Sequence, residues 1–293
     1  MGKLTVLSYG CGQDSWAILQ KIAYDAEFRN KYVDDQFMVI MADTADEHPQ
    51  TYKHLIYTKQ FCKKHGITFV FLTNNMGYHS KAWPGLRERY RMSNCIGSKA
   101  FPKTCTDNLK IKVIYRYIEH FLSLNYDVSH GRKKGIKEFA ERYGKIRMLI
   151  GFAKGEEGRV ASDDSCPVWM QKSIDRSYPL IDIGYDRSAC QKYTIATNNP
   201  VPIPSNCMLC PWMNKAELLY LRRFHPSDYN EWTELEQNKI NSNLHMGDKN
   251  LGVWGKKLLP EILKEAEQEF GYWSDEELIQ YKMSHGHCIK SKY

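Results

Sequence analysis

The chain has 293 residues, enough for one large α/β domain or for a core domain with a smaller C-terminal addition. Its 42% hydrophobic and 26% charged residues are typical of globular proteins and exclude an intrinsically disordered chain. The formal net charge of +7 permits nucleotide or nucleic-acid binding, and surface lysines that only confer solubility give the same value. The N-terminus lacks a basic-then-apolar leader and no apolar run could span a bilayer, so we expect a cytoplasmic protein with no membrane partner.

Cysteine usage favours metal chemistry over disulfides. The chain has nine cysteines, and thiols in the cytoplasm normally stay reduced. Cysteines at ligand-like spacing are therefore better candidates for a metal ion or an iron–sulfur cluster than for cross-links. The oligomeric state is left open by the sequence, and a homo-oligomer is compatible with it.

The N-terminal stretch has the pattern of a buried strand followed by a phosphate-binding turn. Residues 4–7 are mostly apolar and predict the strand, and apolar residues from Trp16 onward recur on one helical face. Free N–H groups and the helix dipole favour an anion at the helix N-terminus, and glycines allow phosphate oxygens to approach. A Mg²⁺ ion could be held there by Asp14. The nucleotide-binding candidates in this turn are Ser8, Gly10, Cys11, Gly12, Gln13, Asp14 and Ser15. The alternative is an ordinary strand-to-helix turn with chance glycines.

The turn Ser-Tyr-Gly-Cys-Gly-Gln-Asp-Ser, residues 8–15, resembles the PP-loop of the ATP pyrophosphatase superfamily, whose core is Ser-Gly-Gly-x-Asp-Ser. Aligned on Asp14 and Ser15, Gly10 replaces the first Ser and Cys11 the first Gly. A form found among relatives of phosphoadenosine phosphosulfate (PAPS) reductase departs only at Cys11. No Gly-Lys-Ser/Thr follows, which excludes the Walker pattern. This PAPS reductase-like resemblance extends to sulfonucleotide reductases, sulfurtransferases of DNA phosphorothioation and phage relatives. It implies ATP or PAPS as the bound adenine nucleotide.

The following segments continue an α/β pattern. Residues 36–42 predict a second buried strand. Because ligands gather at the carboxyl ends of parallel strands, Asp43 and Thr44 are candidates to contact a ribose or base. Residues 73–101 show no clear periodicity, which indicates either a substrate lid or packing around Trp83. The elements expected further along are a helix over 50–65, a strand over 67–72 and a strand over 146–152.

A second segment that resembles the family lies at residues 103–110. Cys105 and Lys110 match part of the Cys-Cys-x-x-Arg-Lys motif of sulfonucleotide reductases, while Thr106 and Leu109 depart from it. In those enzymes the cysteines bind an iron–sulfur cluster and the basic residues face the nucleotide's anions. The Lys- and Arg-rich stretch after it indicates either a solvated helix face or a surface for nucleic acid.

The end of the strand expected over 146–152 carries a third segment of this kind. It resembles the family's Gly-Ile-x-x-Asp-Glu-x-x-Arg, with Gly155 in place of the Asp. The resemblance implies that Gly151 lies close to the nucleotide. It also implies that Glu156 and Arg159 brace the site or its anionic ligand.

Cys207 and Cys210 form a Cys-x-x-Cys turn after a proline-rich, extended approach. The two-residue gap lets both thiolates reach one metal centre. A [4Fe–4S] cluster, structural zinc and a redox-active pair are the alternatives. In PAPS reductase-like proteins a Cys early in a helix precedes this turn, which adds Cys190. The resemblance thus implies the four-thiolate set Cys105, Cys190, Cys207 and Cys210.

The last third of the chain is expected to be helical. We divide the sequence into a PP-loop nucleotide-binding domain with the cysteine cluster, residues 1–212, and a helical C-terminal region, residues 213–293. Ser274 predicts a capping box for the last helix. Cys288 follows two histidines and resembles the C-terminal nucleophilic Cys of sulfonucleotide reductases. The alternative for Cys288 is a chance cysteine in a frayed tail.

These segments occur in the family's order and imply an α/β fold with a parallel, Rossmann-like sheet of the adenine nucleotide alpha hydrolase type. Helices are expected on both faces, followed by the helical extension. One implied activity is attack on the α-phosphate of ATP, with Mg²⁺ held at Asp14, pyrophosphate release and sulfur transfer to a nucleic acid or small acceptor from a sulfur-donor protein. The second is reduction of a sulfonucleotide by Cys288. Cys105, Lys110 and Cys288 favour this second reaction instead. The third is a non-catalytic, nucleotide-binding accessory subunit.

Overall fold

The computed structural model describes residues 2–285, and at its centre is a five-stranded, all-parallel sheet of order β3-β2-β1-β4-β5. β1 is central, and its Leu7 pairs with Val39 on one side and Leu149 on the other. The α/β class and the parallel sheet are thus confirmed. The strands are β1 (Leu4–Ser8), β2 (Gln36–Ala42), β3 (Thr68–Leu72), β4 (Ile146–Ile150) and β5 (Ile174–Ser177). Of these, β5 was not expected, because its four residues Ile-Asp-Arg-Ser carry no apolar run.

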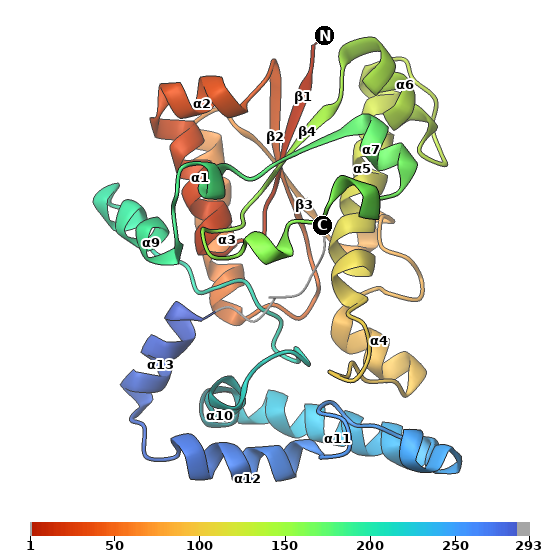
Figure 1. Cartoon of the computed structure of the whole chain (residues 1–293), viewed down its shortest axis with the longest axis vertical. Coiled ribbons are helices and arrows are strands. Elements are labelled where there is room, and N and C mark those ends of the chain that lie inside the picture. Colours follow the sequence, from red (N-terminus) through yellow and green to blue (C-terminus); the bar gives the residue numbers. More distant parts are fainter. Residues whose placement is uncertain (1, 286–293) are drawn as a thin grey trace.

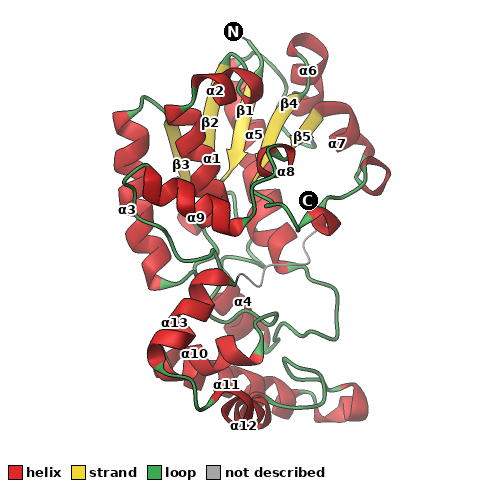
Figure 2. Cartoon of the chain, turned by 60° about the vertical axis from the view of Figure 1, so that its left-hand side comes forward, coloured by secondary structure: helices red, strands yellow, loops and turns green. Residues whose placement is uncertain are grey.

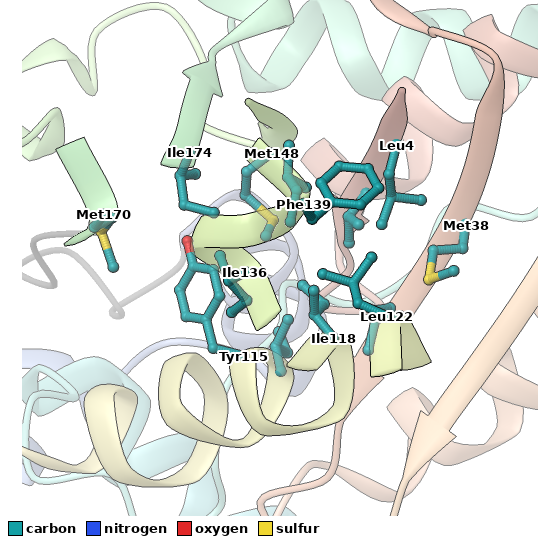
Figure 3. Close-up of a cluster of buried hydrophobic side chains, with 14 of the residues drawn as sticks. Leu4, Met38, Tyr115, Ile118, Leu122, Ile136, Phe139, Met148, Met170 and Ile174 are labelled. Carbon is teal, nitrogen blue, oxygen red and sulfur yellow. The ribbon is translucent and has the colours of Figure 1, made fainter. Parts of the chain in front are cut away.

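Helices lie on both faces of the sheet (Figure 1). Alternating side chains of the strands form two cores, one on each face. Leu4 and Val6 enter the first core, whose packed side chains are shown in Figure 3. Leu7 enters the second core, together with Trp16. The first core is covered by α5 (Lys112–Asn125), α6 (Lys134–Tyr143) and α7 (Val168–Ser173). The second is covered by α1 (Gln13–Tyr24), α2 (Ala26–Tyr32), α3 (Pro49–Lys64), α8 (Pro179–Asp182) and α9 (Arg187–Ala196).

A third core holds the helical C-terminal region, which lies beyond the carboxyl ends of the strands (Figure 2). Its helices are α10 (Lys215–Phe224), α11 (Pro226–Ser242), α12 (Leu259–Phe270) and α13 (Asp275–Ser284). Leu86 and Tyr90 of α4 (Leu86–Ser93) and Leu209 of the Cys-x-x-Cys turn belong to the same core. The packing therefore crosses the division drawn at residue 212. The capping box at Ser274 is confirmed. Among the described residues, no helix combines the length and apolarity needed to cross a membrane.

The stretch 73–101, which shows no periodicity in the sequence, contains α4. This helix has only eight residues, of which Leu86 and Tyr90 are buried, so it is too short to repeat an apolar pattern. Arg87 ties α4 to its surroundings, because one of its nitrogens lies 2.7 Å from Asp46 Oδ1 and 2.8 Å from Asp228 Oδ1. Asp46 in turn accepts a hydrogen bond from Leu209 N. The Cys-x-x-Cys turn is thus anchored to the loop after β2.

Candidate nucleotide cleft and thiol pocket

The turn after β1 lies where the strand order reverses direction. Chain connections from β1 run to β2 on one side, while β4 pairs with β1 on the other. In open parallel sheets this switch point leaves a crevice outside the carboxyl ends of the strands, where ligands bind. Here the crevice is a cleft of about 870 Å³, with its open mouth included. The sheet topology therefore places the predicted PP-loop at the position that favours ligand binding.

Helix α1 presents an uncapped N-terminus to this cleft. Its N-cap residue, Gly12, has no side chain to satisfy the first N–H groups. Ser15 Oγ accepts a hydrogen bond from Gly10 N at 3.3 Å, which holds the turn closed. The twelve-residue helix thus directs backbone N–H groups and the positive end of its dipole at the cleft, as an anion site requires.

Cys11 contributes its backbone but not its thiol to the turn. Its φ of 58° lies in the left-handed region that favours glycine, the residue that the PP-loop pattern has at this position. The side chain is fully buried, and its Sγ donates to Thr51 O at 3.5 Å. Burial raises the pKa of the Cys11 thiol to about 12. The thiol thus belongs to the core beneath the loop and stays protonated at neutral pH.

The glycines of the turn and of the end of β4 also leave space for other segments of the chain to pack closely. A Cβ on Gly12 would lie 2.7 Å from Ser205 N, and one on Gly10 would lie 3.2 Å from Ser205 Oγ. A Cβ on Gly151, at the end of β4, would lie 2.9 Å from Ser15 N. Close packing of the loop against residue 205 and against β4 is therefore a second reason for glycine here, besides the approach of phosphate.

Most of the predicted nucleotide-binding residues line the cleft. Those present are Ser8, Gly10, Gly12, Gln13, Asp14, Ser15, Lys110, Gly151, Glu156 and Arg159. The structure does not bring Cys11, Asp43 or Thr44 into the lining. Asp43 instead accepts hydrogen bonds from Tyr52 Oη and Ala45 N. The residues added by the structure include Tyr9, Thr106, Phe152, Arg187, Ser205 and Asn206.

An ion network crosses the cleft wall and is centred on Arg187. Its Nη2 donates to Asp14 Oδ2 at 3.3 Å and to Glu156 Oε1 at 3.4 Å. Arg159 lies 3.0 Å from the same Glu156 oxygen. Burial raises the pKa of Asp14, and the adjacent Arg187 charge partly opposes that rise.

Several polar atoms in this network, and one on the neighbouring Ser205, are buried and have no hydrogen-bond partner within residues 2–285. They are Asp14 Oδ1, Arg187 Nε, Arg159 Nε and Ser205 Oγ. An unpaired carboxylate oxygen beside an anion cradle fits a hard cation such as Mg²⁺, and unpaired guanidinium N–H groups fit phosphate oxygens. The donor set of the cleft therefore fits a magnesium-bound polyphosphate.

Arg187 was given no role by the sequence analysis. The sequence does contain a signal, because Arg187 opens the helix that carries Cys190 within the segment that resembles the family. Nothing in the linear pattern shows that the first turn of α9 lies against α1. The packing of α9 on α1 places Arg187 beside Asp14 across 173 positions of sequence.

Lys110 enters the cleft from a π-helical turn, η2 (Asp107–Ile111), which continues into α5. Its Nζ lies 3.0 Å from Oε1 of Glu47, whose side chain is fully buried. Thr44 Oγ1 donates to the same oxygen at 3.2 Å. Thr44 therefore supports Lys110 through Glu47 rather than contacting the cleft itself.

Three of the predicted metal-binding thiols share a second pocket. This pocket is lined by Cys105, Cys207 and Cys210. Four residues line both this pocket and the cleft and so form a shared wall: Thr106, Lys110, Ser205 and Asn206. A metal centre built on these thiols would thus adjoin the cleft. Within residues 2–285, the structure contains no group of three or more His, Cys, Asp or Glu side chains placed to hold one metal ion. Loading the pocket requires these thiols to converge and lose their protons.

Cys190 lies away from the other three. It is fully buried on α9 in the second core, and burial raises the pKa of its thiol, with the Asp14 charge adding to that rise. Cys288 lies outside the described residues. The last described turn is attached to the loop, because Met283 O accepts hydrogen bonds from Gln13 Nε2 at 2.9 Å and Gln191 Nε2 at 3.1 Å.

Comparison with protein-family models gives no match to this chain, and comparison with curated proteins gives no significant match. The functional proposals below therefore depend on the chain's own residues and geometry, together with the motif resemblance described above.

Proposed function

We propose that the chain binds ATP with Mg²⁺ in the cleft and cleaves it between the α- and β-phosphates, adenylating an acceptor that afterwards takes sulfur. The observation that carries this proposal is the α1 N-terminus at the sheet's switch point, faced by the Asp14–Arg187–Glu156 network. The resemblance of residues 8–15 to PP-loops supports the choice of α–β cleavage and of an adenine nucleotide.

The residues of the cleft have distinct roles in this proposal. Backbone N–H groups at the start of α1 hold the phosphates that leave as pyrophosphate. Arg187 exchanges its contact with Asp14 for a phosphate oxygen, which frees the carboxylate for Mg²⁺. Lys110 enters from the opposite wall, where it would face the α-phosphate and the charge that develops on it.

The reaction itself is a displacement at phosphorus. An acceptor oxygen bonds to the α-phosphorus while the bond to the bridging oxygen of the β-phosphate breaks, and pyrophosphate departs. The contribution of the protein is positioning and electrostatic neutralisation. A Mg²⁺ ion, when bound at Asp14, supplies charge compensation for pyrophosphate. The acceptor and the sulfur donor, for which a persulfide-bearing protein fits the chemistry, are supplied by partners.

The products of ATP turnover test this function. With ATP·Mg²⁺ and water as the slow acceptor, the expected products are AMP and pyrophosphate in equal amounts. Formation of ADP and phosphate, or no binding of ATP by calorimetry, would overturn the proposal. Tight ATP binding with no turnover under any acceptor tried would favour the accessory-subunit alternative.

A sulfonucleotide reductase is the second candidate, and one contact favours it. Met283 is anchored to Gln13 of the loop, and Cys288 follows it by five residue steps, which span at most about 17 Å when extended. The Cys288 thiolate would attack the sulfur of PAPS and form an S-sulfocysteine, while the bond to the phosphate oxygen breaks and adenosine 3′,5′-bisphosphate leaves. A dithiol reductant would then attack the cysteine sulfur, release sulfite and become a disulfide. Sulfite formation from PAPS with a dithiol reductant, lost in Cys288→Ser, would establish this activity and displace the ATP proposal.

A further inference from the structure

The eight described cysteines fall into three separate cores. Cys11, Cys62 and Cys190 belong to the second core, between the sheet and α1, α3 and α9. Cys166 packs against the first core, on the opposite face of the sheet. The third core contains or contacts the remaining four, which are Cys95, Cys105, Cys207 and Cys210. Cys190 therefore lies in a different core from the thiols that it was expected to join.

Cys95 lies in the pocket next to that of the Cys-x-x-Cys turn. Cys95 and Cys105 line one pocket, and Cys105 also lines the adjoining pocket of Cys207 and Cys210. The chain after Cys95 is pressed onto the turn, because a Cβ on Gly97 would lie 2.4 Å from Pro211 Cγ. The Cys95 thiol makes one weak hydrogen bond, 3.5 Å to Arg89 O, which a metal could readily replace.

The segment around Cys95 is anchored rather than loose. Ser98 Oγ donates to Gly252 O at 2.7 Å, and Lys99 N donates to Val253 O at 2.9 Å. Lys99 Nζ also donates to Met213 O at 2.8 Å, three residues beyond Cys210. These bonds fix residues 98 and 99 to the loop before α12 and to the chain just after the Cys-x-x-Cys turn.

The surroundings of the four thiols fit a negatively charged metal–thiolate group. Lys99, Lys103 and Lys110 lie around them and would offset its charge: Lys103 and Lys110 line the thiol pocket, and the charge of Cys210 acts on Lys99. Tyr90, Trp83 and Trp212 line the neighbouring pocket and limit access of water. A basic pocket with an aromatic screen is a suitable site for a tetrathiolate centre.

We propose that Cys95, and not Cys190, is the fourth thiolate of a single metal centre with Cys105, Cys207 and Cys210. A [4Fe–4S] cluster and a structural zinc ion have the same requirement for four thiolates, and metal analysis distinguishes them. This assignment does not depend on the nucleotide chemistry, because it is read from metal content alone.

The decisive experiment compares three single variants of the full chain purified without oxygen. Iron, sulfide and zinc per chain and the visible spectrum are measured for the wild type, Cys95→Ser and Cys190→Ser, with Cys62→Ser as a matched buried control. The expected result is a full metal complement in the wild type, Cys190→Ser and Cys62→Ser, and a loss of half or more in Cys95→Ser. Full metal in Cys95→Ser, loss in Cys190→Ser or a metal-free wild type would each overturn the proposal.

A second measurement needs no substitution and is independent of folding defects in a variant. Iodoacetamide labelling followed by peptide mass spectrometry compares metal-loaded with chelator-treated chain. We expect labelling of Cys95 to slow at least tenfold in the loaded chain, while Cys166, half-buried against the first core, reacts alike in both. Equal labelling of Cys95 in the two states would remove it from the centre. ATP binding by either sample reports separately on the proposed function.

Discussion

The nucleotide cleft and the thiol pocket adjoin each other, yet their chemistry differs. The cleft is lined by backbone N–H groups and by charged side chains with unpaired atoms, and it opens to solvent. The thiol pocket lies in the third core among apolar side chains and weakly bonded thiols. Local strand-and-turn geometry builds the loop at the base of the cleft, whereas every part of the thiol pocket requires segments distant in the sequence to pack together.

The wall between the two pockets consists of Thr106, Lys110, Ser205 and Asn206. Variants on the cleft side should therefore alter nucleotide chemistry and leave metal content intact, and thiol variants should first alter metal content. Variants in the wall should change both. The following experiments test this separation.

The largest effect is expected from Asp14→Asn. The substitution removes the unpaired carboxylate proposed to hold Mg²⁺, and loss of a metal-ion contact of this kind costs several kcal/mol of transition-state stabilisation. We expect pyrophosphate release to fall about 100- to 1000-fold, with iron or zinc content unchanged. Asp175→Asn is the matched control, because that half-exposed carboxylate on β5 lies outside the cleft. Activity within threefold of wild type in Asp14→Asn would contradict the assigned role.

The wall residue Lys110 should affect both pockets through stability. In Lys110→Met the fully buried Glu47 carboxylate loses its ion pair, and an uncompensated buried charge costs about 3 kcal/mol or more. The denaturation midpoint and the metal content should both fall. In the double variant with Glu47→Gln the stability should largely return, while ATP turnover stays low because the cation is still missing.

Lys112→Met provides the comparison for that experiment. Lys112 forms an ion pair with Asp107, and their side chains are 49% and 48% exposed. The free energy of unfolding should therefore fall by less than about 1 kcal/mol. If Lys110→Met and Lys112→Met cost the same, then the Lys110–Glu47 pair does not behave as a buried ion pair.

A smaller effect is expected from Arg187, which the sequence analysis did not select. Arg187→Met removes a charge-assisted contact to the phosphates, worth about 1.5–3 kcal/mol, so the Kd for ATP should rise about 10- to 150-fold. Arg187→Lys should recover part of this, because it keeps the charge without the planar fork. Titration calorimetry with ATP·Mg²⁺ measures all three proteins. An unchanged Kd in Arg187→Met would show that its contacts with Asp14 and Glu156 are only structural.

The sequence predicts the sheet and the loop well because both depend on local patterns. Apolar runs at residues 4–7 and 36–42 became β1 and β2, and the glycine-bearing turn lies at the start of α1. β5 and α4 were not predicted, because they are short and carry few apolar residues. Elements stabilised mainly by tertiary packing leave little periodic signal.

The site was predictable where short motifs mark it, in residues 8–15 and also at Lys110, Gly151, Glu156 and Arg159. Ser8 to Ser15 lie in one turn and line the cleft, except for Cys11, whose left-handed backbone turns its thiol into the core. Arg187 and Cys95 reach their pockets through packing of α9 on α1 and of residues 95–99 on the Cys-x-x-Cys turn. Such contacts between remote segments are set by the whole fold and have no spacing rule.

The smallest effects come from the glycines of the loop, which allow a matched pair. A methyl group on Gly12 would lie 2.7 Å from the backbone nitrogen of Ser205, whereas one on Gly10 would lie 3.2 Å from its hydroxyl. A backbone atom held by the proline-rich approach cannot move aside easily, but a side-chain hydroxyl can rotate. Gly12→Ala should therefore lower the free energy of unfolding by about 1–3 kcal/mol, and Gly10→Ala by less than about 1 kcal/mol.

Both variants also test how the two pockets communicate. Gly12→Ala should displace Ser205, which lies in the wall between the two pockets and two positions before Cys207. ATP affinity and metal content should then fall together in Gly12→Ala and remain near wild type in Gly10→Ala. Chemical denaturation, calorimetry and metal analysis on the same preparations give the comparison. If Gly12→Ala weakens ATP binding with full metal content and unchanged stability, residue 205 does not couple the pockets, and Gly12 serves phosphate approach alone.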